Sequence, residues 1–178
     1  MAVVGCGGVG QSVIQGAHIA GASEIYAVDP VEMKRKTAEM LGATHGIDPS
    51  AGDPVTQVQQ LTEGRGADFS FEALGRPETI LQAWQMTRNG GTCTVVGMAR
   101  SDAQITFPAF ELMSTERRLL GCVYGSAQVQ RDFPRFIGLV ETGRLDLGTM
   151  VSRRIALDEV NDAFRAMEAG EVIRSVIV

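Results

Sequence analysis

Hydrophobic residues in the first part of the chain alternate between short apolar runs and longer stretches with helical spacing. The runs at 2–4 and 25–28 have strand length, and each stops at a glycine or at an Asp-Pro pair. Between them, Val9, Val13 and Ala17 recur every four residues, which places them on one face of a helix. Continued along the chain, the pattern predicts strands at 2–4, 25–28, 43–47, 68–73, 92–96 and 118–124, and helices at 9–20, 31–41, 55–63 and 77–87.

Strands that alternate with helices of about ten residues indicate parallel pairing, with helices on both faces of one sheet. We therefore expect a doubly wound α/β fold of the Rossmann type. Residues 88–91 are expected to form the turn before the fifth strand.

After residue 125 the pattern changes. It predicts a helix at 132–141, a strand at 151–155, a helix at 158–168 and a final strand at 172–178 with no evident partner. We expect these elements to pack outside the main sheet. This divides the chain into a domain of residues 1–127 and a C-terminal segment of residues 128–178.

Composition narrows the class of protein. The net charge is −5 and the sequence contains no basic run, so nucleic acid is not an expected partner. No apolar stretch approaches the roughly 18 to 20 residues of a membrane span. The cysteines Cys6, Cys93 and Cys122 are odd in number and widely separated in the sequence. This is typical of small buried side chains in a reducing compartment, which predicts a cytoplasmic protein.

The strongest chemical signal is a glycine-rich turn between the first strand and the first helix. It fits the pattern G-x-G-x-x-G with Gly5, Cys6, Gly7, Gly8, Val9 and Gly10. In this pattern the glycines allow a tight turn, a close approach to a pyrophosphate and tight packing of helix on strand. The free N–H groups of the helix then face the phosphates. A purely structural glycine turn remains the alternative.

An acidic residue follows this turn at the expected place. Asp29 ends the second strand about 20 residues after Gly10, where a carboxylate accepts hydrogen bonds from an adenosine ribose and repels a 2′-phosphate. This favours NAD over NADP. Asp29 could instead be a turn or capping residue. Lys34, one turn into the next helix, could reach the same ribose or be an ordinary solvated lysine.

Beyond these motifs, the chain resembles the C-terminal, coenzyme-binding half of the zinc-dependent medium-chain alcohol dehydrogenase family. The closest similarity is to the branch of formaldehyde and thiol-adduct dehydrogenases. The matching segments are 4–10, 27–29, 41–44, 66–69, 71–76, 95–97 and 170–174.

The resemblance implies further coenzyme contacts. Asp29 and Lys34 would hold the adenosine ribose, Arg76 would lie beside the adenine, and Arg174 would bind the pyrophosphate. Leu74 belongs to the same contact set. The nicotinamide end would be lined by Val96, Gly97, Met98, Cys122 and Tyr124. A surface arginine at 174, and ordinary sheet packing for Met98, Cys122 and Tyr124, are the alternatives.

The resemblance also implies what this chain lacks. In the family the catalytic zinc and the proton relay belong to a catalytic lobe, most of which precedes the glycine turn, and the cysteines and histidines here have no zinc-ligand spacing. We expect the chain to be a fragment, inactive alone, with residues 125–178 returning to that lobe. We expect no metal ligand and no catalytic residue in it. Pairing of the strand at 118–124 with its copy would give a homodimer or homotetramer.

The expected parent enzyme transfers hydride between an alcohol carbon and the nicotinamide of NAD. Its substrate would be a small alcohol or aldehyde, or an aldehyde–thiol adduct. Two alternatives stay open: a zinc-free quinone or enoyl reductase using NAD(P)H, and a dinucleotide-binding module without turnover. The sequence leaves open the alcohol, the use of a thiol cofactor and whether NAD is tightly retained.

Overall fold

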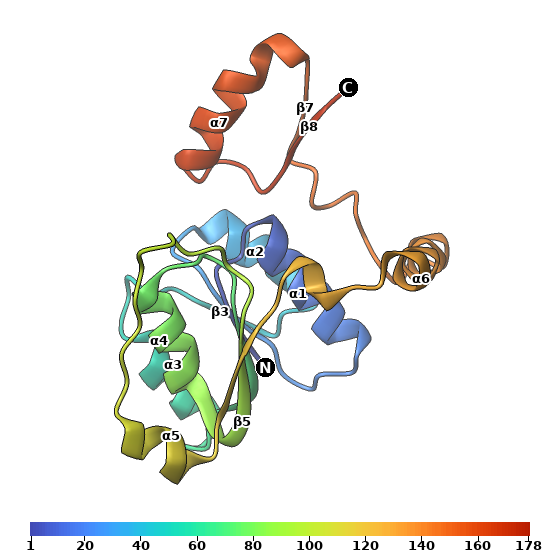
Figure 1. Cartoon of the computed structure of the whole chain (residues 1–178). Coiled ribbons are helices and arrows are strands. Elements are labelled where there is room, and N and C mark those ends of the chain that lie inside the picture. The colour runs from blue at the N-terminus through green and yellow to red at the C-terminus, as the bar shows by residue number, and fades with distance from the viewer.

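Six parallel strands form the main sheet of the computed structural model, which describes residues 1–178, and their order is β3-β2-β1-β4-β5-β6 (Figure 1). The strands are β1 Ala2–Val4, β2 Tyr26–Val28, β3 His45–Ile47, β4 Ala67–Glu72, β5 Thr87–Val95 and β6 Arg118–Gly121. The order reverses between β1 and β4. The predicted doubly wound Rossmann fold is therefore confirmed, and this reversal creates the crevice where such sheets bind ligands.

Helices cover both faces of the sheet. They are α1 Gly8–Ile19, α2 Glu32–Met40, α3 Pro54–Leu61, α4 Pro77–Met86 and the shorter α5 Ala109–Thr115. Alternate residues of β1 belong to two separate hydrophobic cores. Val3 packs with residues of α1 and α2, whereas Ala2 and Val4 pack with residues of α3 and α4. This two-sided burial explains why the strands read as continuous apolar runs.

Three sequence predictions about the main sheet need correction. β5 begins at Thr87, not at residue 92. Its pairing with β4 shifts register between Ala67 and Phe69, so residues 88–91 are accommodated as an irregularity in the strand. Helix α5 was not expected from the sequence. The edge strand β6 ends at Gly121 rather than 124, because Tyr124 and Gly125 adopt positive φ angles of 48° and 68° in a one-turn 3-10 helix, Tyr124–Ser126.

The C-terminal part holds the remaining elements of the chain. It contains α6 Val129–Glu141, β7 Arg153–Ile155, a 3-10 turn at Leu157–Glu159, α7 Val160–Glu168 and β8 Ser175–Ile177. The expectation that the last strand lacks a partner is wrong, because β8 pairs in parallel with β7 in a separate two-stranded sheet. As predicted, these elements lie outside the main sheet (Figure 1). The proposed boundary after residue 127 falls immediately before α6.

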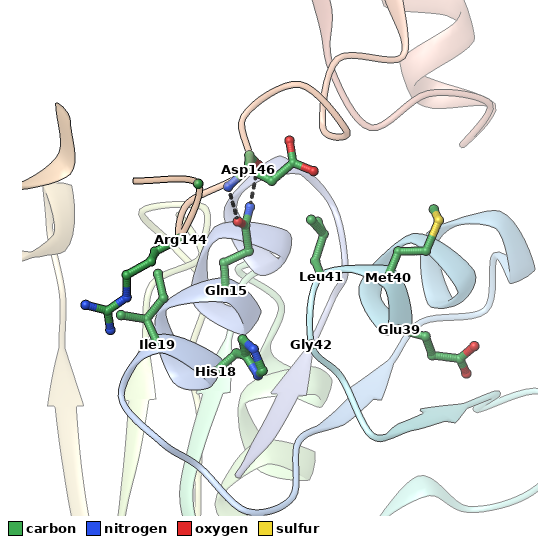
Figure 2. A pocket seen from close by; sticks show the side chains of 10 residues that line it. Gln15, His18, Ile19, Glu39, Met40, Leu41, Gly42, Arg144 and Asp146 are labelled. Atoms are coloured by element: carbon green, nitrogen blue, oxygen red, sulfur yellow. Dashed lines mark hydrogen bonds between the residues drawn. The ribbon is translucent and has the colours of Figure 1, made fainter. Parts of the chain in front are cut away.

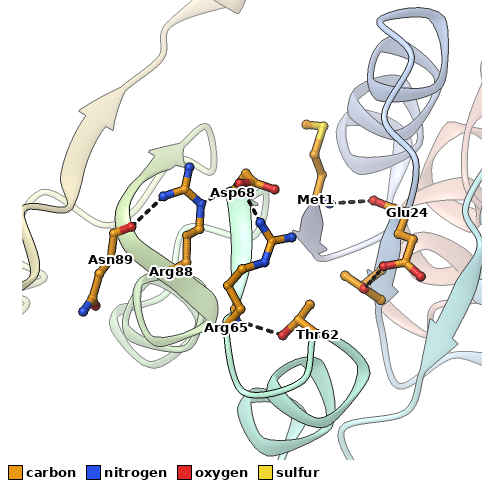
Figure 3. A network of polar contacts seen from close by, with 9 residues as sticks. Met1, Glu24, Thr62, Arg65, Asp68, Arg88 and Asn89 are labelled. Carbon is orange, nitrogen blue, oxygen red and sulfur yellow. Dashed lines mark hydrogen bonds and ion pairs between the residues drawn. The ribbon is translucent and has the colours of Figure 1, made fainter.

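A polar network closes the amino ends of the strands, opposite the glycine turn (Figure 3). The Asp68 carboxylate accepts hydrogen bonds from Arg65 and Arg88, at 3.3 and 2.5 Å, and the terminal amine of Met1 donates to the carbonyl oxygen of Glu24. Arg88 holds the pKa of Asp68 below its ordinary value by donating to it. This end of the sheet is thus tied together by internal ion pairs.

No helix in the chain has both the length and the apolar character needed to span a membrane.

Candidate functional site

The glycine turn joins β1 to α1 at the carboxyl end of the sheet. Gly5 has a φ of +91° and donates its amide to the carbonyl oxygen of Val28 at 2.8 Å. A Cβ atom placed on Gly10 would lie 1.8 Å from the carbonyl oxygen of Gly5, so a side chain there would displace the helix from the strand. Gly5 and Gly10 are therefore required by the backbone itself.

The outer side of the turn is open, and its donors are unpaired. A Cβ atom on Gly7 would meet no protein atom within 4 Å. Gly7 precedes the helix without a side-chain cap, and the amides of Gly8, Val9 and Gly10 donate to no acceptor in the protein. A helix N-terminus with free N–H groups and a partial positive charge is a favourable place for a phosphate.

Asp29 lies directly against this turn, at the end of β2. Its side chain is 5% exposed. Oδ2 accepts a hydrogen bond from the amide of Cys6 at 2.8 Å, and Oδ1 accepts one from the amide of Val31 at 2.9 Å. Asp29 thus has the local structural role that was the alternative interpretation. An ionised carboxylate can accept about four hydrogen bonds, so two acceptor positions remain for a ligand.

Gln11 connects the glycine turn to α2, a role not predicted from the sequence. The side chain is fully buried, and its Nε2 donates to the carbonyl oxygens of Cys6 at 3.0 Å and Lys34 at 2.8 Å. The available signal was a polar residue on the buried face of α1, where burial requires hydrogen-bond partners. Lys34 itself is half-buried and forms no ion pair; its Nζ lies close to Gly170.

Arg174 places a positive charge over the glycine turn, although it follows Gly10 by 164 residues in the sequence. Its Nη2 lies 3.1 Å from the position that a Cβ atom would take on Gly8. The side chain is exposed and makes no hydrogen bond or ion pair with the protein. The structure therefore brings an unpaired guanidinium and the unpaired amides of α1 to one place.

The loops after β4 and β5 pack together beside the turn. A Cβ atom on Gly97 would lie 2.1 Å from the amide nitrogen of Gly75, and one on Gly5 would lie 2.7 Å from Cγ of Leu74. These contacts bring Leu74 next to the glycine turn and Gly97 against the loop that carries Leu74.

Glu72, at the end of β4, holds these loops and was also not predicted. It is fully buried. Its Oε1 accepts from the amides of Leu74 and Gly75 and from the hydroxyl of Thr79, while Oε2 has no partner within the protein. A charged residue at the end of a buried strand was the signal in the sequence.

The remaining predicted contacts are less closely grouped. Arg76 precedes α4, is exposed and has no partner. Met98 and Tyr124 are 94% and 95% exposed. Val96 and Cys122, by contrast, line a largely apolar hollow of about 530 Å³ that runs beside α1 and that Val9 and Arg174 also border. The role of each of these residues toward a coenzyme stays a prediction.

No three or more His, Cys, Asp or Glu side chains lie close enough together to hold a metal ion. Burial raises the pKa of the thiols of Cys6 and Cys93, and for Cys6 the neighbouring Asp29 carboxylate raises it further. Burial thus favours the protonated form of both thiols.

Comparison with known proteins decides the family. Residues 8–142 match the family model described as zinc-binding dehydrogenase. The chain belongs to this family. Among its zinc-binding dehydrogenase relatives, S-(hydroxymethyl)glutathione dehydrogenase of Paracoccus denitrificans is 34% identical over an alignment of 183 positions, which covers 99% of this chain and 48% of that protein.

Solved zinc-binding dehydrogenase structures agree with the fold. Benzyl alcohol dehydrogenase of Acinetobacter calcoaceticus superimposes with a TM-score of 0.94 at 31% identity, over 99% of this chain and 48% of the other. A putative zinc-binding dehydrogenase of Sinorhizobium meliloti 1021 bound to NADP gives 0.88 at 31% identity, over 99% and 51%. The chain spans about half the length of the relatives it matches.

Proposed function

We propose that this chain is the NAD-binding portion of an alcohol dehydrogenase whose substrate is an alcohol or a formaldehyde–thiol adduct. One observation carries the proposal: the unpaired guanidinium of Arg174 lies over Gly8, where the first-turn amides of α1 are also free. A pyrophosphate placed there would receive charge-assisted hydrogen bonds from both sides. The open side of Gly7 gives it room.

The environment of Asp29 supports NAD rather than NADP. Its carboxylate lies at the end of β2, where the adenosine ribose of a Rossmann ligand is held. The nearest arginine, Arg35, is already engaged: one nitrogen donates to the carbonyl oxygen of Asp29 at 2.6 Å and another pairs with Asp48 at 3.0 Å. Arg35 is therefore not free to receive a 2′-phosphate. This argues against a reductase that uses NADPH, although one relative has been solved with NADP.

In this proposal the chain binds and orients the coenzyme but holds no group that reacts with substrate. Bound NAD supplies the hydride acceptor at its nicotinamide ring. Val96 and Cys122 would border the nicotinamide end, with Gly97 allowing the loop to approach closely. Leu74 and Arg76 would lie along the adenosine side. The zinc that acts on the alcohol oxygen would be held by the half of the enzyme that this chain does not include.

Isothermal titration calorimetry with NADH and with NADPH tests the proposal on the chain as it stands. We expect saturable binding of NADH, at least about tenfold tighter than NADPH, because a buried carboxylate faces the added phosphate. No heat of binding with millimolar NADH would refute the proposal. NADPH binding more tightly than NADH would favour the reductase alternative.

The same proposal includes self-association through β6. This strand is at the edge of the sheet, and Leu120 within it and Val123 just after it are 50% and 78% exposed. An exposed apolar edge strand pairs readily with another chain. Sedimentation should show a dimer or tetramer that Leu120→Lys weakens. A wild-type chain that stays monomeric at high concentration would contradict this part.

The free thiols of all three cysteines fit a cytoplasmic protein.

A further inference from the structure

Gln15, two turns into α1, forms a reciprocal pair of hydrogen bonds with the backbone of a residue far along the chain. The side chain is 4% exposed. Its Nε2 donates to the carbonyl oxygen of Asp146 at 2.8 Å, and its Oε1 accepts from the amide of Asp146, also at 2.8 Å (Figure 2). Both polar atoms of a buried amide are therefore satisfied by one residue. This fixes Asp146 relative to the helix in both distance and direction.

Asp146 begins a strap, residues 146–152, that lies along α1. Met150 of the strap is 2% exposed and packs into the core beside Ile14 and Ala17. Its sulfur also lies 3.3 Å from Nε2 of Gln15. The Asp146 carboxylate accepts from the amide and hydroxyl of Thr149, and this hydroxyl lowers the pKa of Asp146. The strap is thus held against the helix by its polar start and by one buried apolar side chain.

The end of the strap holds the backbone that carries Arg174. The amide of Ser152 donates to the carbonyl oxygen of Arg174 at 2.8 Å, and the Ser152 hydroxyl accepts from the amide of Ile173 at 2.8 Å. These two bonds fix the backbone just before β8. From there the Arg174 side chain reaches back over Gly8, at the start of the same helix that Gln15 belongs to.

We infer that Gln15 is a positioning residue for coenzyme binding: by holding the strap against α1, it sets Arg174 over the free amides at the start of that helix. This inference rests on the proposed function. One rigid helix then supplies the amides and also fixes, through its second turn, the place of the guanidinium that faces them. The turn before β8 has one further support, since Gly170 packs near Val31, the residue before α2. Loss of Gln15 should therefore weaken this arrangement without abolishing it.

A double-mutant cycle read by NADH affinity tests the inference. Arg174→Ala should weaken NADH binding by about 10- to 100-fold, the usual range for a lost charged hydrogen bond. Gln15→Met keeps the side-chain volume but removes the donor and the acceptor, and should weaken binding by roughly three- to tenfold. In the Arg174→Ala background, Gln15→Met should change the affinity by less than about twofold. Ser152→Ala, which leaves α1 untouched, should act in the same direction and also lose its effect in that background.

The matched control is Gln57→Met. Gln57 also donates its side-chain amide to a loop carbonyl, that of Gly52 at 3.2 Å, but lies on α3, on the opposite face of the sheet. It should leave NADH affinity unchanged. Thermal unfolding of each variant reports purely structural loss, which would persist without Arg174 and would not depend on ligand.

The outcomes separate the two claims. NADH binding by the wild type, with full affinity in Gln15→Met or with equal losses in both backgrounds, would overturn the role of Gln15 and leave the proposed function standing. No NADH binding by the wild type would refute the proposed function and this inference with it. A loss that depends on Arg174 supports both.

Discussion

The backbone amide of Cys6 donates a 2.8 Å hydrogen bond to Oδ2 of Asp29, so the glycine turn and the end of β2 are one connected unit. The same carboxylate accepts from the amide of Val31 through its other oxygen. One side chain therefore holds the phosphate turn and the start of α2 in register, and it still has acceptor positions free. Under the proposed function, a structural and a ligand-binding role coincide in Asp29.

Asp29→Asn tests this coincidence. The amide keeps the size of the side chain but removes the charge and one of the two acceptor oxygens. We expect NADH affinity to fall by about 10- to 100-fold and the unfolding free energy by about 1 to 3 kcal/mol. The preference for NADH over NADPH should narrow, because the repulsion of the 2′-phosphate is lost. Asp158→Asn, in the exposed 3-10 turn before α7, is the control. Unchanged coenzyme affinity in Asp29→Asn would contradict the assignment.

The glycines of the turn should separate folding from binding. Gly7→Ala adds a methyl group that meets no protein atom, at a backbone angle any residue adopts, so stability should stay within about 0.5 kcal/mol while NADH binding is lost. Gly10→Ala should cost about 3 kcal/mol or more, because its Cβ would overlap the carbonyl oxygen of Gly5. Gly16→Ala, in open space on α1, should stabilise by about 0.5 to 1 kcal/mol and leave binding intact. Calorimetry and thermal unfolding on the three variants give the comparison. Normal NADH affinity in Gly7→Ala would show that nothing approaches this face of the turn.

The three thiols should react at different rates with a disulfide reagent. Burial raises the pKa of Cys6 and Cys93, which keeps their thiols protonated and shielded, whereas Cys122 is half-buried and borders the hollow beside α1. At pH 8 we expect one fast thiol, removed by Cys122→Ser and slowed by NADH, and two more only after unfolding. Three thiols of equal rate in the native protein would contradict the burial described.

Helix α3 offers a pH-dependent test of the fold. Asp53 caps this helix by accepting hydrogen bonds from the amides of Val55 and Thr56. The pKa of Asp53 is lowered, mainly because the Thr56 hydroxyl also donates to its carboxylate. Because the folded pKa lies below the unfolded one, the cap stabilises fully above the unfolded pKa and loses this contribution as pH falls through the folded pKa.

Asp53→Ala should therefore reduce the unfolding free energy by about 1 kcal/mol at neutral pH and by progressively less below about pH 4. Urea unfolding at pH 7 and at pH 3 measures the difference. An equal loss at both pH values would mean that the charged form of Asp53 does not contribute.

Local patterns were sufficient to predict the main sheet and the glycine turn. Val3 and its neighbours Ala2 and Val4 are apolar because each faces one of two helical layers, and such runs are visible in the sequence alone. The turn is also local, since Gly5 is required by its own positive φ and Gly10 by the carbonyl oxygen of Gly5. The pairing of β7 with β8 could not be predicted, because strands of three residues carry little pattern and their partner is set by tertiary contacts.

The supporting residues of the site were missed for a related reason. Gln11 and Gln15 are polar side chains whose partners, the backbones of Lys34 and Asp146, are distant in the sequence. Glu72 has partners close in the sequence, but its burial follows only from the fold. Without the fold, a glutamine on a helix looks like an ordinary solvated residue. Only the observation that all three are buried turns them into hydrogen-bonding anchors of the loops around the turn.

A crystal structure of this chain soaked with oxidised NAD tests the central claim most directly. The account predicts the pyrophosphate between Gly7, the first-turn amides of α1 and the guanidinium of Arg174, with a ribose hydroxyl on the Asp29 carboxylate. A dinucleotide bound elsewhere, or one that leaves Arg174 and Asp29 without contact to it, would contradict the account.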